Sequence, residues 1–160
     1  MSPDPAHAYD RAAVHPKWGT FHYEDQGDGT IKIDPAWIAT TIMVVETVAF
    51  GRIRCHTSVA AAFQGVDSTL EANGWLGLVD KSEFTRNVAG VWVPRHQLHR
   101  VDRPLSLHSW GVAIDLNIST HPYGKYIPQP EGLMIAFSAN GFRWGGNFRN
   151  PDCMHWQAAD

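Results

Sequence analysis

Two stretches of the chain repeat apolar residues at the spacing of an α-helix. The first runs from about residue 57 to residue 73, and its apolar positions are Val59, Ala62, Phe63, Val66 and Leu70. Thr57 or Ser58 can cap its beginning, and Gly74 can end it. The second runs from residue 131 to about residue 140 and ends at Gly141. The apolar face of the first helix must cover other apolar surface, which predicts a sheet beneath it.

Runs rich in β-branched and aromatic residues predict the strands of that sheet. These runs are residues 31–33, 88–93, 112–116, 142–144 and 154–157. Asp34 followed by Pro35 is typical of a helix start and predicts a short helix to about Thr40. The run from residue 42 to residue 50 is too continuously apolar to be assigned to a helix or a strand. Helices beside a small, mostly antiparallel sheet make an α+β fold.

The length of the chain allows one compact domain. Its 160 residues, 44% of them hydrophobic, can bury a single core and leave no room for a second domain of ordinary size. Residues 1–26 are polar, contain proline and show little periodicity, so we expect a surface arm or linker there. The folded domain then spans residues 27–160, and we expect it to be a monomer.

Two segments, one central and one near the end of the chain, carry the candidate chemistry. They supply His108, Asp115 and His155. A catalytic zinc ion usually takes three nitrogen or oxygen ligands from the protein and leaves a fourth position for water. Gly111 allows a tight bend before the strand at 112–116, so the bend can bring His108 beside the Asp115 carboxylate. We therefore expect these three residues to hold one zinc ion.

Asp152 is the candidate general base. It lies three residues before His155, at the end of a polar loop that is rich in glycine, asparagine and proline. A carboxylate that lies close to the metal without binding it can take a proton from the attacking water. The alternative is that Asp152 only caps a turn after Pro151.

The other histidines have no matching pattern of partners. A structural zinc site usually has four protein ligands, often cysteines, whereas the present set has three. His96 and His99 are the strongest alternatives because they flank the site in sequence. The remaining unassigned histidines are His7, His15, His22, His56 and His121.

The pattern Ser-x-His-x-x-Gly-x-Ala-x-Asp, followed by Asp-x-x-His-Trp, resembles a family of zinc peptidases. This family includes D-alanyl-D-alanine carboxypeptidases and dipeptidases and the L-alanyl-D-glutamate endopeptidases of phage endolysins. It belongs to a wider group with lysostaphin and the hedgehog signalling domain. The resemblance covers roughly residues 27–157 and implies the α+β fold of that group. It also implies that His108, Asp115 and His155 are the zinc ligands and that Asp152 is the base.

The resemblance further implies an arginine upstream of the first motif, which holds a substrate carboxylate or the developing oxyanion. The segment Gly90-Val91-Trp92-Val93-Pro94-Arg95 is similar to that part of the family and makes Arg95 the candidate. Arg100 and Arg103 lie close enough in sequence to be alternatives.

Two residues inside the first motif are assigned to substrate binding. Ser106 either orients the loop of His108 or contacts the peptide through its hydroxyl group. Trp110 lies next to Gly111, and we expect its indole to contact the substrate. The alternative is that the indole packs in the hydrophobic core. We expect the side chains of Trp144 and Trp156 to pack in the hydrophobic core.

The resemblance implies a zinc metallopeptidase that hydrolyses stem peptides of peptidoglycan and so degrades the cell wall. An aspartate as the base favours the L-alanyl-D-glutamate endopeptidases, and so does the absence of a signal peptide and of a long capping insertion. A D-alanyl-D-alanine carboxypeptidase is the alternative. A zinc-bearing binding module without activity, as in hedgehog, is another, although the intact base and ligands argue against it.

Charge and hydropathy limit the partners. The formal net charge of −3 gives no electrostatic case for nucleic acid and weakens the interpretation of residues 96–108 as a zinc nuclease. No run of about 18 apolar residues predicts a membrane span. The first residues lack the basic and apolar regions of a secretory signal. We therefore expect a cytoplasmic protein that is released to act on the cell wall.

Two cysteines, Cys55 and Cys153, lie far apart in the sequence. We expect both to be free thiols, with a disulfide between them as the alternative.

Overall fold

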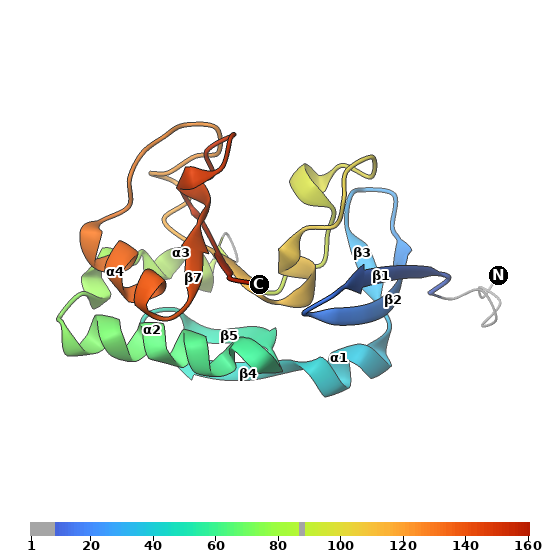
Figure 1. Ribbon diagram of the computed structural model, residues 1–160, viewed down its shortest axis with the longest axis horizontal. Coiled ribbons are helices and arrows are strands. Elements are labelled where there is room, and N and C mark those ends of the chain that lie inside the picture. The colour runs from blue at the N-terminus through green and yellow to red at the C-terminus, as the bar shows by residue number, and fades with distance from the viewer. Residues whose placement is uncertain (1–8, 87–88) are drawn as a thin grey trace.

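The computed structural model describes residues 9–86 and 89–160. The strands in this part of the chain form three small antiparallel sheets, and four α-helices accompany them. Figure 1 shows the first sheet at one end of the molecule, and α2 beside the β4–β5 hairpin along the base. The α+β fold is therefore confirmed, with three small sheets where the sequence predicted one.

The first sheet contains most of the segment that was expected to be an arm. Strands β1 (Arg11–His15), β2 (Gly19–Asp25) and β3 (Ile31–Ile33) pair in that order. Phe21 and Tyr23 alternate with polar neighbours on β2, so both aromatic rings lie on the buried face. Phe21 packs against Trp37 and Trp110. The arm prediction is therefore wrong over residues 11–25, while residues 1–8 lie outside the described chain.

The predicted helices are found close to their expected positions. In α1 (Pro35–Thr41), the side chain of Asp34 accepts a hydrogen bond from the Ala36 amide at 3.0 Å. A single 3-10 turn leads from Thr57 into α2 (Ala60–Ala72), and Gly74 follows with a left-handed φ of 71°. The second predicted helix is α4 (Glu131–Ala139), and α3 (Lys81–Thr85) is a short helix that the pattern did not predict.

The unassigned run after α1 forms one arm of a hairpin. Strand β4 (Ile42–Thr47) pairs with β5 (Gly51–His56). One side of β4 packs against α2, and α2 also packs against α4. The long apolar run is therefore a strand that lies under helix α2.

The strand predicted over residues 88–93 is wrong for its described part. Residue 88 lies outside the described residues, and 89–93 form only an isolated bridge between Gly90 and Asp115. The Val93 amide instead donates to the His108 carbonyl at 3.1 Å. Apart from that bridge, residues 89–93 join no strand ladder.

The third sheet carries the C-terminal motif. Strands β6 (Ala113–Asp115), β7 (Phe142–Trp144) and β8 (His155–Ala158) pair in the order β6-β8-β7. In this register Asp115 stands opposite His155. Trp156 on β8 stacks on Phe137 of α4 at a centroid distance of 4.5 Å, which anchors the central strand to the helix. The three predicted strands of this region are therefore confirmed to within about a residue at each end.

A single apolar cluster joins the sheets and helices. Its fully buried members include Phe21, Phe50, Phe63, Leu70, Ile114, Leu116, Leu133, Phe137 and Trp156. Among the described residues, no helix has the length and hydropathy needed to cross a membrane.

Candidate metal centre

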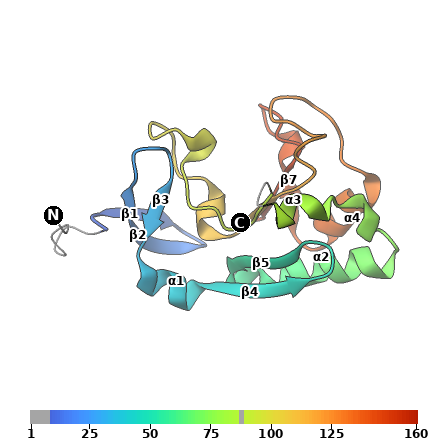
Figure 2. The same cartoon turned by 180° about the vertical axis from the view of Figure 1, so that it is seen from behind.

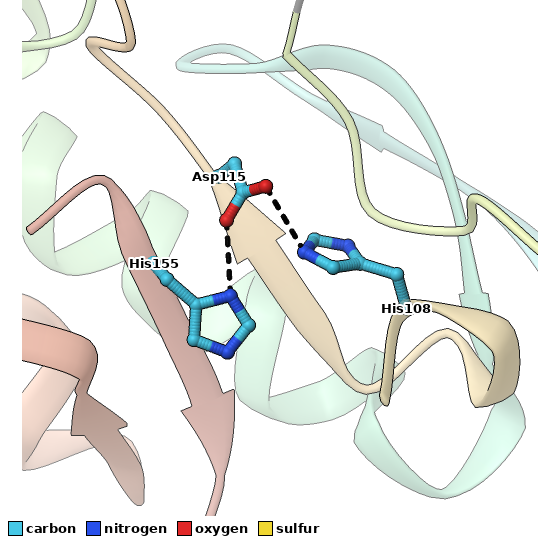
Figure 3. A group of neighbouring side chains, drawn as sticks. All are labelled: His108, Asp115 and His155. Carbon is cyan, nitrogen blue, oxygen red and sulfur yellow. Dashed lines mark hydrogen bonds and ion pairs between the residues drawn. The ribbon is translucent and has the colours of Figure 1, made fainter. Parts of the chain in front are cut away.

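His108, Asp115 and His155 meet as the sequence predicted. One donor atom from each lies within 4.8 Å of the other two. Figure 3 shows the Asp115 carboxylate between the two imidazole rings, with Oδ2 at 3.1 Å from His108 Nε2 and Oδ1 at 3.0 Å from His155 Nδ1. His108 comes from the 3-10 turn Leu107–Trp110, and the other two face each other across the β6–β8 ladder.

The bend between His108 and Asp115 depends on Gly111. Its φ of 72° lies in the left-handed region, which favours glycine. A Cβ atom at this position would also lie 2.8 Å from the His56 amide nitrogen. The tight bend therefore requires both the backbone freedom and the small size of glycine.

The imidazole of His108 is oriented by the backbone. Its Nδ1 lies 2.9 Å from the carbonyl oxygen of Val91, so Nδ1–H donates to that carbonyl. Nε2 is buried and, although close to Asp115, has no aligned hydrogen bond. This tautomer leaves the Nε2 lone pair directed at the carboxylate.

The imidazole of His155 is oriented by a side chain. Its Nε2 lies 3.0 Å from Gln157 Oε1, two residues along β8. An amide oxygen only accepts, so Nε2–H donates to Gln157 and Nδ1 faces Asp115. Ligating histidines commonly have such a partner on the other ring nitrogen, and it sets their tautomer.

The donor set fits a divalent metal ion. With their other nitrogens engaged by Val91 and Gln157, both imidazoles direct lone pairs at the Asp115 carboxylate, and such an arrangement needs a cation between the donors. Burial alone would raise the pKa of Asp115, but His108 and His155 lower it well below its usual range. Burial would lower the pKa of His155, but the hydrogen bond and charge of Asp115 raise it. The site therefore attracts positive charge, and its nitrogen and oxygen donors suit zinc and other divalent ions.

Asp152 lies beside this group in the loop that precedes β8. Its amide donates to the Gly145 carbonyl at 2.9 Å, and its own carbonyl accepts from the His155 amide at 3.1 Å. Its Oδ1 is buried and makes no hydrogen bond. Burial, and then the negative charge of Asp115, raise the pKa of the Asp152 carboxyl above its usual value. A carboxylate of raised pKa is the stronger base.

Arg95 lies on the other side of Asp115. Its Nη2 is 3.9 Å from Asp115 Oδ2, and only 17% of its side chain is exposed. Ser109, which is fully buried, both accepts from the Arg95 amide and donates to the Arg95 carbonyl, each at 3.0 Å. Of the two alternatives, Arg100 pairs with Asp102 at 2.7 Å on an exposed part of the loop, whereas Arg103 lines the same pocket as Arg95.

Ser106 and Trp110 differ in position. The Ser106 hydroxyl accepts from the His108 amide at 3.3 Å and caps the turn that carries this histidine, and the residue also lines the pocket. Trp110 is 5% exposed, donates to the Gly19 carbonyl at 3.0 Å and does not line the pocket. Its predicted substrate contact is therefore wrong, because β2 of the unexpected N-terminal sheet covers the indole. Trp144 and Trp156 lie in the core, as expected.

The other histidines of the described chain lie outside the donor group. His96 forms hydrogen bonds to Asp25 and, at 2.7 Å, to the Arg103 carbonyl. His56 and His121 are engaged by nearby carbonyl and hydroxyl oxygens. His7 lies outside the described residues.

The metal group opens into a pocket of about 490 Å³. His108, His155, Asp152, Arg95, Ser106 and Gln157 all contribute to its walls. The pocket therefore places the donor atoms, a candidate base and a cationic side chain within reach of one bound molecule.

Comparison with known families agrees with this geometry. Residues 100–158 match the family model described as D-alanyl-D-alanine carboxypeptidase. The matched segment contains all three donor residues and Asp152, so the chain carries a metallopeptidase site with His108, Asp115 and His155 as its candidate metal-binding triad. Comparisons with curated proteins and with solved structures gave no match.

Three supporting groups were not predicted from the sequence. They are Gln157, the carbonyl of Val91 and the hydroxyl of Ser109. Gln157 could have been found, because it lies two residues after His155 on the same face of a strand. The other two depend on how residues 91–95 lie against the turn of His108, which no local pattern indicates.

Both cysteines are buried free thiols, as expected. Burial raises the pKa of Cys55 to about 11, so its thiol stays protonated. The sulfur of Cys153 accepts from the Ile127 amide and donates to the Lys125 carbonyl, both at 3.3 Å. This thiol ties the loop before α4 to the loop of Asp152.

Proposed function

We propose that this metallopeptidase is a carboxypeptidase that removes the terminal D-alanine from stem peptides of the bacterial cell wall. The observation that carries the proposal is the pocket in which Arg95 and Asp152 accompany the donor group of His108, Asp115 and His155. The family description supports this activity better than the endopeptidase expected from the sequence.

A divalent ion held by the three donors would polarise the scissile carbonyl and lower the pKa of the attacking water. The ion is expected to be zinc. Asp152 takes one proton from the water as its oxygen adds to the carbonyl carbon. The same carboxyl returns the proton to the nitrogen of the leaving D-alanine as the C–N bond breaks. The raised pKa of Asp152 suits both proton transfers.

Arg95 supplies the positive charge for the substrate. Its side chain is largely buried and its backbone is held by Ser109, so the guanidinium is preorganised. A preorganised guanidinium in a partly dehydrated pocket binds a carboxylate, or an oxygen that becomes negative during reaction, far better than a mobile one does. A peptide that ends in D-alanine offers both groups within one residue of the scissile bond.

The experiment is digestion of purified peptidoglycan, and of a synthetic peptide ending in D-alanyl-D-alanine, by zinc-loaded protein. Each reaction is run with and without a chelator and analysed by mass spectrometry. Loss of a single alanine that stops with chelator supports the carboxypeptidase. New termini at alanine and glutamate would instead establish the L-alanyl-D-glutamate endopeptidase that the sequence analysis favoured. Binding of the peptide without cleavage would indicate a binding module.

A further inference from the structure

The pocket beside the metal group carries a local excess of positive charge. Arg103 and Arg149 line it together with Arg95, and Asp152 is the one acidic side chain among the described residues of the lining. This local excess contrasts with the formal net charge of −3 for the whole chain. The excess therefore belongs to the pocket and does not reflect the composition of the protein.

The three arginines differ in how their charge is balanced. Arg95 is held beside Asp115, whereas neither Arg103 nor Arg149 has an ion-pair partner among the described residues. Both guanidinium groups line the pocket without an acidic partner to neutralise them, so they are available to bind an anion there.

The backbone that carries Arg103 is anchored at both sides. Its carbonyl accepts a hydrogen bond from His96, which is 4% exposed and also bonded to Asp25 of β2. The loop crosses the turn before β3, where the His96 amide donates to the Gly29 carbonyl at 2.9 Å. In Figures 1 and 2, the segment from Arg95 to residue 105, drawn in yellow, lies beside β3 in both views. Arg103 therefore projects from a loop that the N-terminal sheet supports.

This loop also has unusual backbone conformations. Leu98 and His99 both have positive φ, at 55° and 53°, although neither is glycine. Gly29, with φ of 89°, allows the close approach, since a Cβ there would lie 2.0 Å from the His99 carbonyl oxygen. Strained backbone of this kind persists where the surrounding structure enforces it, and it is frequent beside binding sites.

Arg149 comes from the second loop of the pocket. The Phe148 and Asp152 amides both donate to the Gly145 carbonyl, and the Gly124 amide donates to Pro151. These bonds hold the ends of the short segment that carries Arg149. The two arginines thus line the same pocket from two separate loops, each held by backbone hydrogen bonds.

We propose that Arg103 and Arg149 form a second anion subsite, which binds a carboxylate of the peptide other than the one beside the scissile bond. The proposal rests on the proposed function and narrows its substrate class to acidic peptides. Arg95 binds the C-terminal carboxylate of the substrate peptide near the metal. Arg103 and Arg149, together called the arginine rim, bind a free carboxylate on a residue further along the substrate peptide. A stem peptide with a D-glutamate carries such a group.

The test compares two synthetic peptides that end in D-alanyl-D-alanine and carry a D-glutamate upstream. In one peptide the free carboxylate of the glutamate is left as the acid, and in the other it is an amide. We expect the zinc-loaded wild type to show about a tenfold lower KM for the acid, with equal kcat, because the subsite contributes to binding alone. R103Q/R149Q should abolish this preference, so that its KM values for the two peptides are equal.

The matched control is R52Q, an exposed arginine on β5 that does not line the pocket, and it should keep the tenfold preference. Equal KM values for the two peptides in the wild type would overturn the subsite, as would a preference that survives in R103Q/R149Q. If neither peptide is cleaved, the proposed function fails. Calorimetric Kd values of the two peptides then decide the subsite alone, because equal values overturn it and tighter binding of the acid supports it.

Discussion

The metal group and the arginine rim share one pocket but are built differently. His108 and Asp115 are oriented by buried contacts within the C-terminal half, and His155 lies opposite Asp115 in a regular ladder. The arginine rim lies on exposed loops. The loop that carries Arg103 is held by a contact between His96 and Asp25 of the N-terminal sheet. The proposed catalytic chemistry thus rests on buried, regular elements, whereas the proposed substrate selection rests on exposed loops.

The largest expected effect comes from removing a metal ligand. His108→Ala deletes one of the three donors, so zinc binding and peptide hydrolysis should both fall to background. Metal content after dialysis and turnover of the D-alanyl-D-alanine peptide measure the two losses. His22→Ala, on the exposed side of β2, is the control and should retain both. A His108→Ala protein that keeps stoichiometric zinc would contradict the assignment.

Asp152→Asn should separate metal binding from catalysis. The amide is nearly the same size but cannot accept the proton of the water, so kcat should fall by about 10²- to 10⁴-fold. Zinc content should stay at the wild-type level because Asp152 is not one of the three donors. Asp10→Asn, which is exposed and distant in sequence from the pocket, is the matched control. Full activity of Asp152→Asn would remove this residue as the base.

Gln157→Leu tests how firmly the metal group is oriented. Loss of the acceptor for His155 Nε2–H should allow the ring to turn or change tautomer, and we expect roughly a 10- to 100-fold loss of zinc affinity. Competition with a chromogenic chelator measures it. Gln157→Glu, which keeps an acceptor, should restore most of the affinity, whereas Gln64→Leu on the exposed face of α2 should leave it unchanged. Wild-type affinity in Gln157→Leu would show that the ladder alone orients His155.

The smallest expected effect is on stability, and it comes from removing His96, which holds the loop that carries Arg103. Burial lowers the pKa of His96, but its hydrogen bond and ion pair with Asp25 outweigh this and raise the value above 6.5. A pKa that is raised in the folded state stabilises the fold below the unfolded pKa, and this contribution is lost as pH rises through the folded pKa. His96→Gln should therefore cost roughly 2 kcal/mol at pH 6 and less at pH 9.

Urea unfolding of the wild type and of His96→Gln at the two pH values measures this difference. His22→Gln serves as the control for loss of an exposed imidazole on the same sheet. A cost that is equal at pH 6 and pH 9 would mean that the protonated pair with Asp25 contributes nothing to the attachment of the loop.

Two sequence motifs, one around His108 and Asp115 and one around His155, predicted the members of the metal group. Gly111 sets the bend between His108 and Asp115, and a short β ladder then places His155 opposite. The N-terminal sheet was missed because β1 is short and polar, with Val14 71% exposed. The alternation of Phe21 and Tyr23 after the turn at Trp18 was the available signal for β2. Missing that strand also led to the wrong placement of Trp110.

By itself, the sequence determined the α+β class and the principal helices, because these depend on periodicity within short segments, and it determined the metal ligands through two short motifs whose residue types suit a metal ion. Only the tertiary structure decided that residues 11–25 belong to the folded domain, that Trp110 is in the core and that Gln157 orients His155. The same holds for the arginine rim. Arg103 and Arg149 are 46 positions apart in the sequence, and only the folded loops place both in the lining of one pocket. Contacts between distant segments depend on the packing of the whole chain, and no local pattern records them.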